Sequence, residues 1–208
     1  MEITKEVLEK LKEKGSIHTS LGDGKYRVDL KPVRIQGIGE AEELFGAEET
    51  ANEMIAVYLF DETEILTYKQ MVNDQMVAGL IYLDNYDEAL ESVEEVRRSL
   101  LTALIDRKIN KYISGMNGIT KKLEKDKYFF AIKQRYVQEL RDNRFSLLEE
   151  VKTVNIGNEM AVTLSIGLGM GGETYGQNYE FSRMAIDMAL GRGGDQAVIK
   201  SAEKIEYF

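Results

Sequence analysis

Two short polar segments carry the side chains of this chain that are best suited to chemistry. Asp84, Asn85 and Asp87 follow directly after residues 77–83, an apolar run typical of a strand that is buried on both faces. The tripeptide Lys-Asp-Lys at 125–127 separates two further apolar runs. Carboxylates suit hard divalent cations, and lysine suits phosphate. The plainer interpretation, which we favour from the residues alone, is two solvated turns, with Asp87 capping the next helix.

Rare residue types exclude several other kinds of site. The chain has no cysteine and one histidine, His18. Disulfides, zinc ribbons, cysteine nucleophiles and two-histidine metal motifs are therefore excluded within this chain. We expect His18 to be a surface or turn histidine.

Charge and hydropathy limit the partners. Lysine and arginine number 27 against 36 acidic residues, which gives a formal net charge of −9. This balance argues against nucleic acid as a partner, because a sequence-independent grip on phosphates needs clustered basic residues. No apolar run approaches the roughly 20 residues that span a bilayer. We therefore expect the chain as given to be soluble.

A glycine-rich segment resembles a dinucleotide fingerprint only formally. Residues 167–172 read Gly-Leu-Gly-Met-Gly-Gly and follow an apolar segment. In a true fingerprint the glycines open a helix directly, whereas residues 173–178 intervene here. We interpret residues 167–176 as a loop between a strand and a helix.

The order of the predicted elements indicates an α+β fold. Apolar periodicity predicts helices at 3–11, 65–75, 136–151 and 181–190, one or two helices from 88 to about 113, a β-hairpin at 119–124 and 128–132, and strands at 25–30, 54–60, 77–83, 161–166 and 196–200. From residue 77 onward, this order predicts a ferredoxin-like architecture: an antiparallel-containing sheet with helices on one face.

Two motifs in the second half of the chain resemble those of a known family. Val-Thr-Leu-Ser-Ile-Gly at 162–167 and Asp-Met-Ala-Leu at 187–190 resemble a GGDEF domain. Leu-Asp-Asn-Tyr-Asp-Glu at 83–88 and Ala-Leu-Gly-Arg-Gly-Gly-Asp-Gln at 189–196 are similar to the GdpP-type cyclic-di-AMP phosphodiesterases. The GGDEF resemblance covers about residues 77 to 200.

The resemblance implies a division of the chain. Residues 1–64 resemble the C-terminal half of a PAS domain, 65–76 a connector helix, and 77–208 a degenerate GGDEF domain. Proteins of this family also carry membrane helices and a C-terminal DHH/DHHA1 phosphodiesterase domain. The resemblance therefore implies a parent protein on the cytoplasmic side of the cell membrane, attached through N-terminal helices. It implies haem in a complete PAS domain and Mn²⁺ in the DHH domain, but no cofactor in this chain. A haem role for His18 is the alternative to a surface or turn histidine.

The departures from the family's active relatives imply lost cyclase chemistry. An active diguanylate cyclase holds two cations on its nucleotide with paired carboxylates. Tyr82 falls at the first of these positions and Asp84 at the second. The signature hairpin falls at about 126–130, which reads Asp-Lys-Tyr-Phe-Phe, without its glycines and with most acids replaced by aromatics. The guanine-reading asparagine falls near Leu90.

We therefore expect a regulatory signalling module of a cyclic-di-AMP phosphodiesterase. Two alternatives remain: slow ATP or GTP hydrolysis at the degenerate site, and a structural dimerisation unit. Residual, weak nucleotide binding would use Asp84, Asn85, Asp126 and Lys127. We also expect self-association, because half a PAS sheet would leave an edge unpaired, which we place along residues 25–30. Either another copy of the chain or the connector helix would cover this edge.

Overall fold

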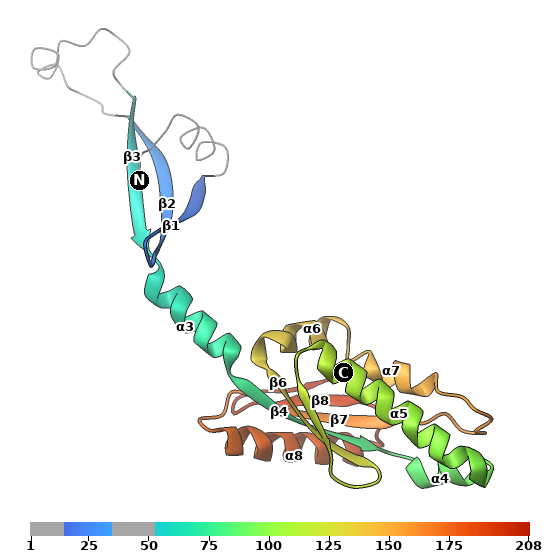
Figure 1. The fold of residues 1–208 in the computed structure, drawn as a ribbon. Helices are drawn as coiled ribbons and strands as arrows, with labels where there is room; N and C mark the ends of the chain where they lie inside the picture. The colour runs from blue at the N-terminus through green and yellow to red at the C-terminus, as the bar shows by residue number, and fades with distance from the viewer. Residues whose placement is uncertain (1–14, 35–52) are drawn as a thin grey trace, which may run out of the picture. The chain divides into compact units, whose positions relative to one another are not determined.

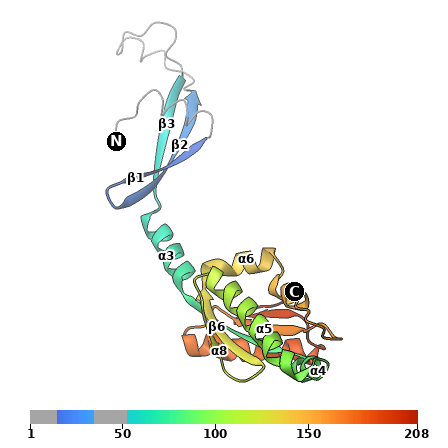
Figure 2. The ribbon, with the colours of Figure 1, turned by 45° about the vertical axis from the view of Figure 1, so that its right-hand side comes forward.

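The computed structural model describes residues 15–34 and 53–208, which belong to two compact units, 1–71 and 72–208 (Figures 1 and 2). The helix expected at 3–11 lies outside the described residues. Among the described residues, none of the helices combines the length and the apolar composition of a membrane span.

The first unit contains a three-stranded antiparallel sheet in the order β1-β2-β3. Its strands are β1 (Ser16–Leu21), β2 (Gly24–Arg34) and β3 (Glu53–Asp61). The sequence pattern did not predict β1, because its mostly polar side chains do not show the alternation of apolar and polar residues that is typical of a strand. The predicted unpaired edge along 25–30 is wrong, because that segment lies in the central strand and pairs on both sides. The PAS interpretation stays a prediction.

Helix α3 (Thr63–Asp74) follows β3 directly, as the propensity of this segment predicts. Its beginning is fixed by hydrogen bonds within the first unit. Lys25 N donates to Thr63 Oγ1 at 2.8 Å, and Thr63 N donates to Asp61 Oδ1 at 2.9 Å. Hydrogen bonds from the Thr63 hydroxyl and amide hold the pKa of Asp61 below its ordinary value.

The second unit is built on a six-stranded mixed sheet in the order β5-β6-β4-β7-β8-β9. Its strands are β4 (Met76–Leu83), β5 (Ile119–Lys122), β6 (Lys127–Lys133), β7 (Leu164–Gly169), β8 (Ala197–Lys200) and β9 (Ile205–Tyr207). Strand β4 pairs antiparallel with β6 and β7, so the predicted central position of residues 77–83 is confirmed. Strand β7 pairs parallel with β8.

Helices cover both faces of this sheet, so the expectation of helices on one face is wrong. The helices are α4 (Tyr86–Glu91), α5 (Glu95–Gly115), α6 (Val137–Asp142), α7 (Leu147–Lys152) and α8 (Tyr175–Gly191), with a 3₁₀ turn at Gln134–Tyr136. Helix α8 lies on the opposite side of the sheet from α5 and α7 (Figure 1). The main core lies under α5, where Ile105 and Ile109 pack with Ile81 and Phe130.

The single helix expected at 136–151 is two short helices, α6 and α7. Arg144 and Phe145 adopt positive φ angles of 51° and 54°, which break the helical path. The break lets Phe145 enter the core, where it is 1% exposed. Apolar spacing alone did not reveal the break, because the helical spacing of apolar residues continues on both sides of the break.

The expected glycine-rich loop at 167–176 is also partly wrong. Gly167 and Gly169 belong to β7, and the loop begins only after them. A Cβ atom at Gly167 would lie 2.6 Å from Ser182 O and 2.8 Å from Ile186 Cα, both in the backbone of α8. These glycines therefore serve close packing of the helix on the strand.

Candidate functional site

The two polar segments singled out in the sequence lie side by side at one end of β4. Leu83 N donates a hydrogen bond to Asp126 O at 2.9 Å. Tyr82 pairs with Lys127 of β6 on one side and with Ser165 of β7 on the other. The sheet therefore brings the end of β4 and the tip of the β5–β6 hairpin together, as the family signature requires.

The carboxylate of Asp84 is held by hydrogen bonds on both oxygens. Oδ1 accepts from Ser165 Oγ at 2.6 Å, and Oδ2 accepts from Asp195 N at 2.9 Å. Gly194 has a positive φ of 77°, and a Cβ there would lie 2.8 Å from Asp84 Cγ. Asp84 therefore fixes the turn between α8 and β8. Its partners Ser165 and Asp195 are not predictable from local spacing, although the motif at 162–167 contains Ser165.

Asn85 also uses its side chain to hold the backbone. Its Nδ2 donates to Ala161 O at 2.9 Å, and its Oδ1 accepts from Thr163 N at 2.9 Å. Both ends of the amide thus bind the segment that leads into β7. Asn85 precedes α4 but makes no side-chain capping bond.

Asp87 lies inside α4, so its predicted capping role is wrong. Its Oδ1 instead lies 2.6 Å from Lys125 Nζ, and Lys127 Nζ lies 2.9 Å from Glu124 Oε2. Hydrogen bonding to these carboxylates raises the pKa of both lysines. Such exposed ion pairs contribute little to stability because water and salt screen them, so either ammonium group could turn to a phosphate.

Tyr82 is the residue that the resemblance aligns with the first acid of an active cyclase, and this alignment stays a prediction. Burial raises the pKa of its phenol above the ordinary value, so the group is neutral at physiological pH. Lys127 Nζ lies 5.4 Å from the centre of the Tyr82 ring. A neutral phenol below a lysine does not attract a divalent cation.

Two of the three aromatic residues of the signature hairpin, Tyr128 and Phe130, belong to the core, whereas Phe129 is only partly buried. Tyr128 and Phe130 are each 1% exposed, and Leu90 packs against the same cluster. Tyr128 Oη donates to Asp106, which also binds Lys122 Nζ at 2.9 Å. Within residues 15–34 and 53–208, no three acidic or histidine side chains gather as a metal site would need.

His18 does not fit a haem site in the described part of the first unit. Its Nδ1 lies 3.2 Å from Glu62 Oε2, and its side chain is 68% exposed. The adjoining hollow, between β1, β2 and Leu66, has a volume of about 140 Å³. This is below the roughly 300–1,000 Å³ typical of small-molecule sites.

The sequence profile of the family described as "Cyclic-di-AMP phosphodiesterase GdpP-like, GGDEF domain" matches residues 81–207, more than half of the chain. The chain belongs to this family. Cyclic-di-AMP phosphodiesterases GdpP of Geobacillus thermodenitrificans and Bacillus subtilis are each 28% identical over 154 residues. These matches cover 73% of this chain and 23% of each relative, so the chain spans about a quarter of their length.

Solved structures confirm the fold of this GdpP-like GGDEF domain. The active GGEEF domain of a diguanylate cyclase from Vibrio cholerae superposes with a TM-score of 0.52 at 12% identity, over 65% of this chain and 89% of that one. The resemblance stated from the sequence is thereby confirmed for the family and for the α+β fold. The nucleotide-binding role of Asp84, Asn85, Asp126 and Lys127 stays a prediction.

Proposed function

We propose that this chain is the regulatory GGDEF-type module of a membrane-anchored cyclic-di-AMP phosphodiesterase, without cyclase or phosphodiesterase chemistry of its own. The proposal rests on the two positions that the resemblance aligns with the paired acids of an active cyclase. Tyr82 replaces one acid, and the Ser165 hydroxyl and Asp195 amide hold the other, Asp84, in a structural role. A parent of this kind would be anchored at the cytoplasmic side of the membrane, with haem in its complete PAS domain and Mn²⁺ in its DHH domain.

The connector helix supports a role in passing a signal. At its N-terminus, Lys25 N binds Thr63 Oγ1 within the first unit. At its C-terminus, Asp74 Oδ1 binds Arg135 Nη2 and lies 3.3 Å from Lys133 Nζ, within the second unit. Lys133 ends β6, the strand that begins at Lys127. A displacement of the helix would therefore act on the strand that carries the signature hairpin.

The test is a chimaera in which this chain replaces the matching segment of the Bacillus subtilis phosphodiesterase. In it, Asp74→Ala removes the ion pairs at the end of α3. We expect the rate of cyclic-di-AMP hydrolysis to move about two- to thirtyfold toward the rate of the phosphodiesterase domain alone, because coupling energies of roughly 0.5–2 kcal/mol are typical. The rate is measured with the purified chimaera and Mn²⁺.

The matched control is Glu139→Ala, which removes the same charge from an exposed position on α6. We expect this chimaera to keep the unsubstituted rate. Both variants must retain the thermal unfolding midpoint of the parent chimaera. A folded Asp74→Ala chimaera with an unchanged rate would contradict the proposed regulatory role.

Slow ATP or GTP hydrolysis is the alternative function, and the two lysines of the hairpin tip favour it. Lys125 and Lys127 make exposed ion pairs to Asp87 and Glu124. A triphosphate could replace both carboxylates without uncovering a buried charge. The backbone of Asp126 is already used by Leu83, so its carboxylate would be the group left to hold a cation.

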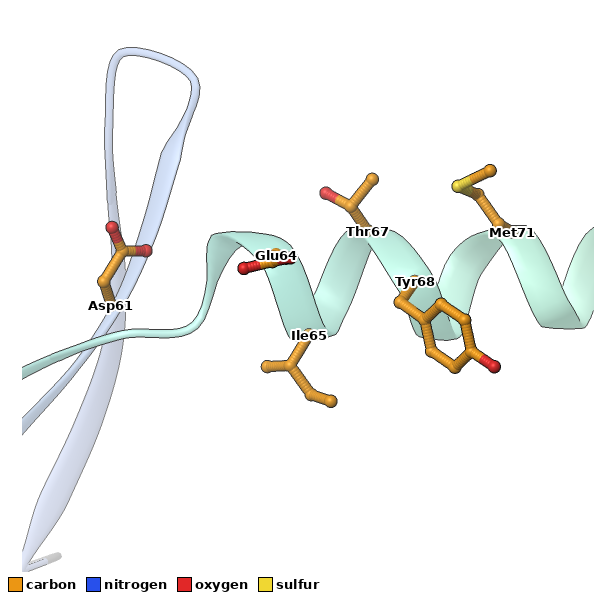
Figure 3. A pocket seen from close by; sticks show the side chains of 6 residues that line it. All are labelled: Asp61, Glu64, Ile65, Thr67, Tyr68 and Met71. Atoms are coloured by element: carbon orange, nitrogen blue, oxygen red, sulfur yellow. The ribbon is translucent and has the colours of Figure 1, made fainter.

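A structural dimerisation role is the other alternative, and one face of α3 favours it. Ile65, Tyr68 and Met71 are 50%, 63% and 65% exposed, and no described residue of the helix is buried. Ile65 and Tyr68 project toward the same side of the helix, whereas Met71 points to the other side in this view (Figure 3). An apolar face on a short exposed helix is suited to packing against another helix. Analytical ultracentrifugation of a Tyr68→Lys chain tests whether this face of α3 mediates association.

A further inference from the structure

Strand β3 forms one edge of the three-stranded sheet in the first unit. Within the described residues it pairs with β2 on one side, and no strand lies on its other side. An edge of this kind presents backbone N–H and C=O groups that are not paired within a sheet. We propose that this edge pairs with β3 of a second copy of the chain, so that the two sheets become one.

The sequence of β3 lacks the features that keep edge strands apart. The strand has nine residues, and residues 54–60 contain no charge and no proline. The edge strands of the second unit differ. Strand β5 has four residues, two of them lysines, and β9 has three residues with Glu206 at the centre. Short length and charge discourage strand addition, and β3 has neither over its central seven residues.

Both faces of β3 expose large apolar side chains. Val57 and Leu59 are 46% and 62% exposed on one face, and Tyr58 and Phe60 are 44% and 41% exposed on the other. A layer packed on the sheet would cover only one of these faces. An added strand would extend both faces at once, because its side chains alternate in the same way.

The strand is complementary to itself, which argues for a second copy as the occupant. In an antiparallel pair centred on Val57, that residue faces the partner's Val57 across the two-fold axis. Tyr58 then faces the partner's Ala56, and Leu59 faces the partner's Ile55. Each pair is apolar, and the large tyrosine ring meets a small side chain. Directly opposite residues of an antiparallel pair share one face of the sheet, so the pattern of both faces is kept.

A single engineered cysteine tests this register. The chain contains no cysteine, so Val57→Cys would carry the only thiol. Opposite residues on a two-fold axis lie about 4.5–5.5 Å apart between Cα atoms, which a disulfide can span. We expect mild oxidation of the full chain to convert most of Val57→Cys to a covalent dimer on non-reducing gels. Ser20→Cys, exposed on β1, is the matched control and should stay largely monomeric.

Charge reversal of the contact provides the second measurement. Val57→Lys would place two ammonium groups opposite each other. We expect the dissociation constant of the dimer to rise at least about tenfold, which corresponds to 1.4 kcal/mol. Tyr68→Lys, on the exposed face of α3, should leave the dissociation constant unchanged. Analytical ultracentrifugation measures both, and circular dichroism checks that each variant folds.

Three results would overturn the proposal. The first is a strictly monomeric unsubstituted chain, and the second is equal cross-linking of the Val57→Cys and Ser20→Cys chains. The third is a dimer that Tyr68→Lys dissociates and Val57→Lys does not, which would place the contact on α3. None of these results bears on the ion pairs of Asp74, so the proposed regulatory function is tested separately.

Discussion

Replacing Leu80 by aspartate is expected to lower the free energy of unfolding of the GGDEF-type unit by at least about 4 kcal/mol. Leu80 is 1% exposed in the middle of β4, between Phe129 of β6 and Gly167 of β7. The substitution removes a buried apolar side chain and places a carboxylate inside the core. Urea denaturation followed by circular dichroism measures the change.

Leu100→Asp is the matched control for this substitution. Leu100 is 51% exposed on α5, so the same chemical change takes place largely in water. We expect a loss of no more than about 1 kcal/mol there. Equal denaturation midpoints for Leu80→Asp and the unsubstituted chain would contradict the placement of β4 at the centre of the sheet.

Adding one methyl group at Gly167 is expected to destabilise the same unit by about 3 kcal/mol or more. The Cβ atom of Gly167→Ala would lie 2.6 Å from Ser182 O and 2.8 Å from Ile186 Cα. These are backbone atoms, so the clash is relieved only if α8 moves away from β7. Differential scanning calorimetry measures the fall in the unfolding temperature.

The same methyl group at Gly191 provides the comparison. Gly191 ends α8, and a Cβ there would meet nothing within 4 Å. Gly191→Ala is expected to be neutral or to stabilise by up to about 1 kcal/mol, because alanine restricts the unfolded chain. Equal effects at the two positions would show that helix α8 does not pack closely on the glycines of β7.

Local patterns in the sequence were sufficient for the central strands and the family. The continuous apolar run at 77–83 and the motif at 162–167 placed β4 and β7 next to each other, as found. The same patterns did not predict where the backbone leaves a helix or where a strand continues through glycines. The periodicity of 136–151 runs through the break at Phe145, and the glycine-rich sequence predicts a loop where two glycines belong to β7. Both features depend on tertiary packing, which a short window of sequence does not show.

The position of the candidate site was predictable, but the state of its side chains was not. The sequence placed Asp84 and Asn85 at the end of a strand beside the hairpin tip, as found. Their hydrogen bonds to Ser165, Asp195, Ala161 and Thr163 join positions more than 75 residues apart in the chain. No local spacing could reveal that both side chains serve the structure.

The central claim is that the degenerate site performs no cyclic-dinucleotide chemistry, and product analysis tests it most directly. The purified chain is incubated with GTP and Mg²⁺ or Mn²⁺, and separately with cyclic-di-AMP and Mn²⁺, and the products are separated by chromatography. We expect no cyclic-di-GMP and no linear or mononucleotide product from cyclic-di-AMP, because Tyr82 cannot hold a cation and Asp84 is bound by Ser165 and Asp195. Stoichiometric formation of cyclic-di-GMP, or cleavage of cyclic-di-AMP by this chain, would contradict the account.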